Sequence, residues 1–125
     1  MRLLPTRRLP VAVLLAAAGL LLPACTSSTP GEAAESVVRR FFEQLPEGNC
    51  AQLAELLVSR SPQACADTVR ELNEHTVRLQ EVLSTQADGR SPEAVMVRAR
   101  LSYGTYVKSQ LLRVERHEGT WRLRL

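Results

Sequence analysis

Aromatic residues are scarce in this sequence: phenylalanine, tryptophan and tyrosine together make up 4% of its 125 residues. One tryptophan and two tyrosines cannot supply the series of stacking side chains that binds single-stranded nucleic acids. The net charge of +3 does not favour nucleic acid either, because three of the arginines precede residue 25, in a segment that we expect to be removed. From residue 25 onward basic and acidic residues balance, so we predict no nucleic-acid partner.

Histidine is also rare, with His75 and His117 as the only two. Together with Cys50 and Cys65 they form none of the ligand spacings known for zinc. No nucleophile–base pair and no phosphate-binding loop is evident in the chain. We therefore predict no metal, no cofactor and no catalytic residue. The length excludes a two-domain enzyme of ordinary size and allows one small domain.

Long apolar runs are limited to residues 11–22, which contain no charge and follow a stretch with three arginines. A helix of twelve residues spans about 18 Å, which is too short for the ~30 Å hydrocarbon core of a membrane. This pattern is typical of a cleaved signal peptide. An uncleaved anchor is the alternative.

The segment Leu22-Pro23-Ala24-Cys25 resembles the lipobox of bacterial lipoproteins. That resemblance implies cleavage between Ala24 and Cys25 and acylation of the Cys25 thiol, whose nucleophilicity suits alkylation. Two or three acyl chains suffice for stable membrane anchoring. The alternative is an ordinary secretory signal cut at another site.

The predicted organisation is a signal peptide over 1–24, a lipidated cysteine and flexible tether over 25–32, and one domain over 33–125. Lipoproteins retained in the inner membrane of some Gram-negative bacteria carry aspartate after the cysteine, whereas this chain has Thr26. We therefore expect an exported, membrane-anchored protein. In a Gram-negative host, the periplasmic side of the outer membrane is favoured.

Two cysteines remain once Cys25 is assigned to lipid. An even pair in a small exported domain predicts a disulfide between Cys50 and Cys65. Such a bridge closes a loop of some fifteen residues and contributes roughly 3 kcal/mol in the chain-entropy model. Two buried free thiols are the alternative.

Three helices are predicted in the first half of the domain. Apolar residues recur at helical spacing from Glu32 to Leu45, Asn49 is placed to cap a short second helix, and Ser61-Pro62 is a start signal for a third. In the third helix Cys65, Val69 and Leu72 share a face. Residues 77–86 suit either a continuation of that helix or a strand before the turn signals of residues 88–92, and we favour the strand.

The C-terminal third alternates as β-strands do. In Ala94–Tyr103 the apolar residues point one way and the arginines the other. Gly104-Thr105 and Glu118-Gly119 suit two-residue turns. The second turn predicts an antiparallel register that starts with His117 opposite Thr120. It continues with Arg116 opposite Trp121 and ends with Leu112 opposite Leu125.

Basic residues outnumber acidic ones in residues 90–125, whereas residues 25–89 are acidic. One interpretation is a basic sheet face formed by Arg98, Arg100, Arg122 and Arg124, which would meet an acidic envelope protein or anionic lipid headgroups. The alternative, which we favour, is a solvated face whose charge is balanced by the acidic helices.

The order of elements is similar to that of the nuclear-transport-factor-2-like, or cystatin-like, superfamily. Three segments carry the resemblance: the helix 37–45 with the following Glu47-Gly48-Asn49, the apolar strand start 94–97, and the ending 118–123. The resemblance implies an α+β fold with N-terminal helices packed on one face of a curved antiparallel sheet. It also implies a cavity between the two layers, which some members use for isomerase or dehydratase chemistry.

A regular Gly104-Thr105 hairpin would place Tyr103, Tyr106, Lys108 and Gln110 on the inner face, where they could line a wet pocket. We favour instead a bulge near Gln110-Leu111 that turns the polar residues outward and Leu111 inward. The sequence thus favours a lipid-anchored, non-catalytic binding module of the cell envelope over an enzyme. The alternative is a small-ligand-binding or weakly isomerase-like cavity protein.

Overall fold

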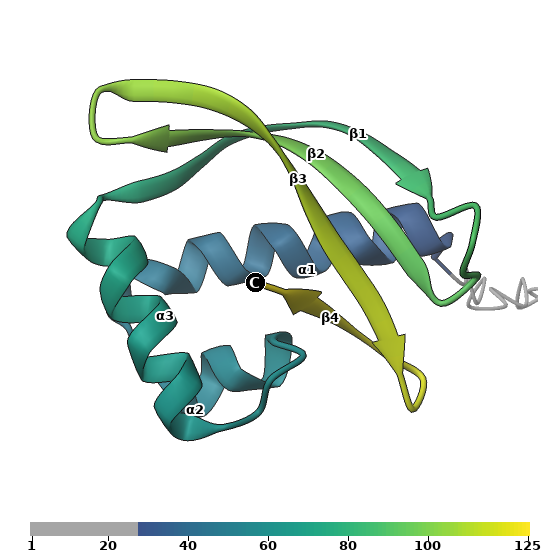
Figure 1. The fold of residues 1–125 in the computed structure, drawn as a ribbon, viewed down its shortest axis with the longest axis horizontal. Coiled ribbons are helices and arrows are strands. Elements are labelled where there is room, and N and C mark those ends of the chain that lie inside the picture. The colour runs from purple at the N-terminus through teal and green to yellow at the C-terminus, as the bar shows by residue number, and fades with distance from the viewer. Residues whose placement is uncertain (1–27) are drawn as a thin grey trace, which may run out of the picture.

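The computed structural model describes residues 28–125 (Figure 1). Ala24 and Cys25, where cleavage and acylation are predicted, lie outside the described residues. Within them the chain forms helices and then strands: α1 (Pro30–Gln44), a 3₁₀ turn (Leu45–Glu47), α2 (Cys50–Leu53), a second 3₁₀ turn (Ala54–Leu56), α3 (Pro62–Glu74), β1 (Val77–Ala87), β2 (Ala94–Tyr103), β3 (Tyr106–His117) and β4 (Thr120–Arg124).

Helix α1 begins at Pro30, two residues earlier than the predicted Glu32. Thr29 is its cap, because the Thr29 hydroxyl accepts a hydrogen bond of 3.2 Å from the backbone N–H of Glu32. Pro30 occupies the first turn, where its missing N–H costs nothing. Residues 30–32 of the predicted tether therefore belong to the helix.

The caps predicted for the next two helices are confirmed. The side chain of Asn49 accepts from the N–H of Ala51 at 3.0 Å, and that of Ser61 accepts from the N–H of Ala64 at 3.4 Å. Cys65 and Val69 of α3 are buried against the core, as their shared helical face predicts.

The four strands form an antiparallel sheet in the order β1-β2-β3-β4. Residues 77–87 are a strand, so the favoured prediction is confirmed and the continued helix is wrong. The β3–β4 register is also confirmed, from His117 opposite Thr120 to Arg113 opposite Arg124. On the far side of β4, the N–H of Val58 bonds the carbonyl of Leu123, so this edge is covered.

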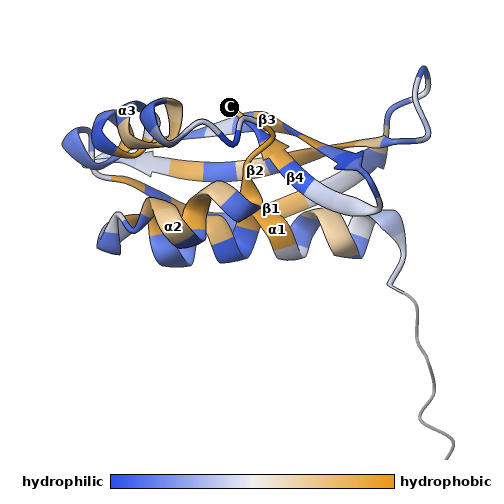
Figure 2. Ribbon diagram, turned by 90° about the horizontal axis from the view of Figure 1, so that it is seen from below, coloured by the Kyte–Doolittle hydropathy of each residue, from blue (hydrophilic) through white to orange (hydrophobic). Residues whose placement is uncertain are grey.

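The core lies between the helices and one face of the sheet, which we call the inner face. Helix α1 lies along the sheet and contacts all four strands (Figure 2). Its buried stripe meets the inward residues of β2, and the fully buried side chains include Phe41, Leu45, Leu53, Val97, Val114 and Leu123. The fold is therefore α+β, with helices on one face of an open antiparallel sheet, as predicted.

The bulge predicted near Gln110-Leu111 is absent, because β2 and β3 pair without interruption from Tyr103–Tyr106 to Ala94–Glu115. Leu111 consequently points to the outer face and is 51% exposed. The reason is that residues 106–111 are exposed on both faces. Lys108 and Gln110 can therefore occupy inner-face positions without losing water, and no bulge is needed.

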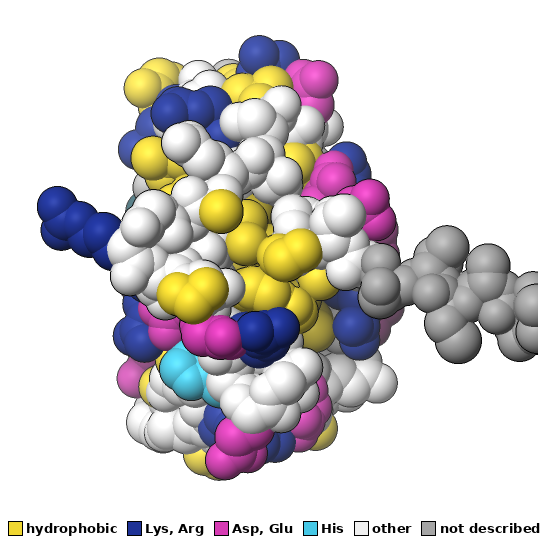
Figure 3. Space-filling model, turned by 90° about the vertical axis from the view of Figure 1, so that its right-hand side faces the viewer, with side chains coloured by type: hydrophobic (Ala, Val, Ile, Leu, Met, Phe, Trp, Pro, Cys, Tyr) yellow, Lys and Arg dark blue, Asp and Glu magenta, His cyan; other side chains and the backbone are white. Residues whose placement is uncertain are grey.

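One end of the molecule is where the described chain enters α1 (Figure 3). Hydrophobic side chains gather in the middle of this end, with charged and other polar side chains around them. The β2–β3 turn lies at the opposite end (Figure 1). The start of α1 and the β2–β3 turn therefore lie at opposite ends of the long axis of the molecule.

Candidate binding surface

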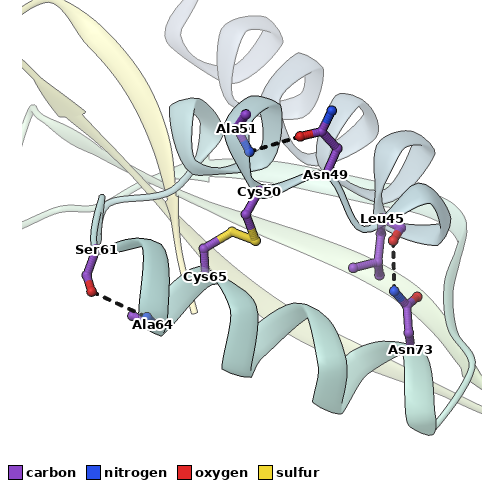
Figure 4. Close-up of a disulfide and its surroundings, with 8 residues drawn as sticks. All are labelled: Leu45, Asn49, Cys50, Ala51, Ser61, Ala64, Cys65 and Asn73. Carbon is purple, nitrogen blue, oxygen red and sulfur yellow. Dashed lines mark hydrogen bonds between the residues drawn. A yellow bond between two sulfur atoms is a disulfide. The ribbon is translucent and has the colours of Figure 1, made fainter.

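The predicted disulfide joins Cys50 of α2 to Cys65 of α3 (Figure 4). The two Cα atoms are 6.0 Å apart, which is an ordinary separation for a bridged pair. A second link lies further along α3, where the side-chain amide of Asn73 donates to the carbonyl of Leu45 at 2.9 Å. These two links attach α3 to the chain that follows α1, so the helical layer is fixed beneath the sheet.

An ion cluster centred on Glu115 lies on the outer face of the sheet. The Glu115 carboxylate accepts two hydrogen bonds from Arg124 and one from Arg113, and it lies 2.9 Å from His117. The hydrogen bonds from Arg124, followed by those from Arg113 and His117, hold the pKa of Glu115 far below its usual range. Sequence analysis did not identify this cluster, although the predicted β3–β4 register brings Glu115 and its partners onto one hairpin.

Arg113 extends this cluster to the β1–β2 loop through Asp88, at 2.7 Å. The backbone N–H of Arg90 and the side chain of Arg113 lower the pKa of Asp88. Glu93 of the same loop is paired with Arg116, whose hydrogen bonds lower the pKa of Glu93. The loop is therefore joined to β3 by two ion pairs.

The four arginines of the predicted basic face have different surroundings. Arg124 is paired with Glu115, and Arg122 donates to the backbone carbonyl of Glu55 at 2.6 Å. Arg100 meets Glu81 at 3.1 Å in a pair that is about half exposed on both sides. Such an exposed pair contributes at most about 1 kcal/mol.

Arg98 is exposed, and within residues 28–125 no carboxylate lies at ion-pair distance from it. The predicted basic face therefore divides into two parts. On β4, Arg122 and Arg124 are bound to the carbonyl of Glu55 and to Glu115, whereas on β2 Arg100 is in an exposed pair with Glu81 and Arg98 has no ion-pair partner within residues 28–125.

Two exposed apolar side chains lie beside this second pair of arginines. Leu111 is opposite Arg98 in the β2–β3 register. Val107 lies on the same face of β3, two residues before Ser109, which is opposite Arg100. Val107 is 47% exposed. We call Arg98, Arg100, Val107 and Leu111 the hairpin patch. Its apolar half was missed by sequence analysis, although the unbroken alternation after Gly104-Thr105 contains the signal.

The four predicted pocket residues come together at the tip of the same hairpin, on its inner face. The Tyr103 hydroxyl is hydrogen-bonded to Gln110, and the Lys108 ammonium lies 5.2 Å from the centre of the Tyr103 ring. Burial raises the pKa of Tyr103. Tyr106, by contrast, is 63% exposed, so this cluster meets solvent on one side.

Two hollows of the surface lie elsewhere. One of ≈150 Å³ is lined by the start of α3, by Leu57–Ser59 and by the end of β4. Another, of ≈300 Å³ and open to solvent, lies between α1 and β1 beside Arg39, Phe42 and Gln80. Neither is lined by a residue predicted for the pocket.

Among residues 28–125, no group of three or more histidine, cysteine, aspartate or glutamate side chains is placed to hold a metal ion. In the same part of the chain, none of the helices has the length and apolar character needed to cross a membrane. The chain matches no protein-family model, and it matches no curated protein.

Proposed function

We propose that this chain is a bacterial lipoprotein whose domain binds an acidic partner protein in the cell envelope without catalysing a reaction. The observation that carries the binding proposal is the hairpin patch, where two exposed apolar side chains lie beside Arg98, which is exposed, and Arg100, which is in an exposed pair with Glu81. Exposed apolar surface next to arginine is typical of protein interfaces. We assign the fold to the cystatin-like type, on the order of its elements.

The anchoring part of the proposal rests on Leu22-Pro23-Ala24-Cys25 and on the short distance from Cys25 to the domain. Helix α1 begins at Pro30, so the chain between them spans at most about 18 Å when fully extended. An acylated Cys25 would hold the end of the molecule shown in Figure 3 next to the bilayer. The hairpin patch would then lie towards the far end, where a partner can reach it.

The intact mass of the chain purified from host membranes tests the anchor. We expect the mass of residues 25–125 plus two or three acyl chains, increasing by about two daltons on reduction of the single disulfide. The variant Cys25→Ala should lose the acyl mass and leave the membrane fraction. An unacylated chain cut at another site would contradict the proposal.

Charge reversal in the hairpin patch tests the binding surface. A photoreactive residue at Val107 should cross-link a protein other than this chain in intact membranes, and the double variant Arg98→Glu/Arg100→Glu should lower the yield of that product at least tenfold. The matched control is Arg40→Glu/Arg70→Glu, which reverses two exposed arginines on the helices. Equal losses in both variants, or none in either, would contradict a role for the patch.

A further inference from the structure

We propose that β3 pairs with β3 of a second copy of this chain, so that two sheets join into one across a two-fold axis. This inference goes beyond the proposed function, because it concerns the backbone edge of β3 and a second copy of this chain, although Val107 and Leu111 of the hairpin patch flank that edge. It rests on three features of residues 106–112: an uncovered edge, weaker protection of that edge than β1 has, and a sequence that complements itself.

The edge of β3 is uncovered over its first half. Strand β4 pairs with residues 113–117 only, so residues 106–112 have β2 on one side and no strand on the other (Figure 1). A two-residue turn closes on a hydrogen-bonded pair, here Tyr103 with Tyr106, and such pairs then alternate along the strands. The backbone N–H and C=O groups of Val107, Ser109 and Leu111 consequently point to the open edge.

The opposite edge of the sheet, β1, shows how this protein protects an edge. The pairing of β1 with β2 shifts register twice, between Leu79 and Glu81 and between Val82 and Ser84. Bulges and charged residues are standard protection against pairing with another chain. β3 has no register shift along β2, and Lys108 is the single charge in residues 106–112. Lys108, on the inner face, is the one protective feature of the open edge of β3, which is therefore less protected than β1 with its two register shifts.

The sequence of residues 106–112 is complementary to itself in antiparallel pairing about Ser109. In this register Val107 faces Leu111 of the second copy on the outer face. On the inner face Lys108 faces Gln110, and Tyr106 faces Leu112. Apolar residues thus meet apolar ones and no like charges meet, an arrangement that stabilises cross-strand pairs.

The backbone selects the same register. Pairing about Ser109 gives every outward N–H and C=O of Val107, Ser109 and Leu111 a partner. Pairing centred on Lys108 would place Leu111 opposite Thr105 of the turn. Pairing centred on Gln110 would place Val107 opposite Arg113, which is already paired with β4. Each shift leaves backbone groups unpaired, so the second copy fits in one register.

Cysteine cross-linking of the full-length chain in its own membranes tests this register. Ser109→Cys should form a covalent dimer with a short bifunctional maleimide, because Ser109 faces its own copy across the axis. Val107→Cys alone should not, since the two copies of Val107 are about 13 Å apart along the strands. Val107→Cys co-expressed with Leu111→Cys should cross-link. Ser84→Cys, exposed on the protected edge of β1, is the matched control and should give no dimer.

A charge exchange at Ser109 provides a second test that does not depend on reactive cysteines. Ser109→Lys places two like charges opposite each other, as does Ser109→Glu. Each variant alone should change the mass in detergent, measured by light scattering, from two chains to one. Mixing the two variants should restore the mass of two chains, which a misfolded variant cannot do.

Three outcomes would overturn the dimer: a wild-type mass of one chain, a dimer that persists in Ser109→Lys, or cross-links from Ser109→Cys to a different protein. The variant Arg98→Glu/Arg100→Glu separates this result from the proposed function. It should lose the acidic partner and remain a dimer, because neither arginine lies on the open edge. Loss of the dimer in that variant would contradict the assignment of two separate surfaces.

Discussion

At the scale of single residues, Thr76 connects the last helix to the sheet. It has a φ of 50°, in the left-handed region, and it follows the residue that ends α3. Its carbonyl also accepts a hydrogen bond of 3.4 Å from the N–H of Gly104 at the tip of the β2–β3 hairpin. A β-branched residue is unfavourable in this conformation, where glycine or asparagine is the usual choice.

Replacing Thr76 by glycine should stabilise the domain by about 1 kcal/mol, because the relief of backbone strain exceeds the added freedom of the unfolded chain. The free energy of unfolding in urea measures the change. Thr105→Gly is the matched control, since Thr105 does not itself have a positive φ, unlike Gly104 before it, and should not gain stability. A gain of equal size in both variants would contradict the account.

Glu115 is the residue on which the outer-face ion cluster depends. Its side chain is 12% exposed, and its oxygens accept from both Arg113 and Arg124. We expect Glu115→Gln to lower the free energy of unfolding by roughly 1–3 kcal/mol, because the partly exposed Arg113 and Arg124 lose their charged acceptor at a largely buried position. Glu118→Gln, an exposed position in the adjoining turn, should change it little. Equal unfolding curves for wild type and Glu115→Gln would contradict this role.

At the scale of elements, the disulfide fixes α2 against α3. It closes a loop of 15 residues, for which chain entropy gives about 3 kcal/mol. The double variant Cys50→Ala/Cys65→Ala should therefore unfold at lower urea concentration than the oxidised protein. A reductant should lower the stability of the wild type and leave that of the double variant unchanged. A wild type insensitive to reductant would show that the bridge contributes nothing.

The elements differ in how far they could be predicted. Helix caps and the β3–β4 register follow from local signals, because Ser61-Pro62 and Glu118-Gly119 each determine a turn or a helix start on their own. The conformation near Gln110 could not be predicted in the same way. Whether Lys108 and Gln110 meet core or water depends on how far the helices extend beneath β3, which no local pattern records.

The candidate surface shows the same division. Arg98 and Arg100 could be placed on one face by alternation along β2 alone. Val107 and Leu111 could not be added to them, because the predicted bulge reversed the face of Leu111. The partners of Glu115 all lie on the β3–β4 hairpin, whereas the link from Arg113 to Asp88 joins that hairpin to the β1–β2 loop. The contact that no local pattern could predict is therefore the one between elements distant in sequence.

At the scale of the whole molecule, the carboxylates with lowered pKa values lie close together, on the β1–β2 loop and near the end of β3 beside it. The pKa of Glu115 is lowered by hydrogen bonds from Arg124, that of Asp88 by Arg90 and Arg113, and that of Glu93 by Arg116. Each group binds its proton less readily in the folded chain than in the unfolded chain. The unfolded state consequently takes up more protons in acid.

The stability contributed by these groups should be fully present above the ordinary pKa of a carboxyl group, near pH 4, and should be lost as the pH falls towards the lower folded values. Urea unfolding measured from pH 7 to pH 3 should therefore give a constant free energy at first and a decreasing one in acid. Glu115→Gln removes the group with the largest shift, so its decrease below pH 4 should be shallower than that of the wild type. Parallel pH profiles for the two proteins would show that the acid sensitivity arises outside the cluster, whereas a shallower profile assigns it to the contacts that hold the β1–β2 loop, β3 and β4 together.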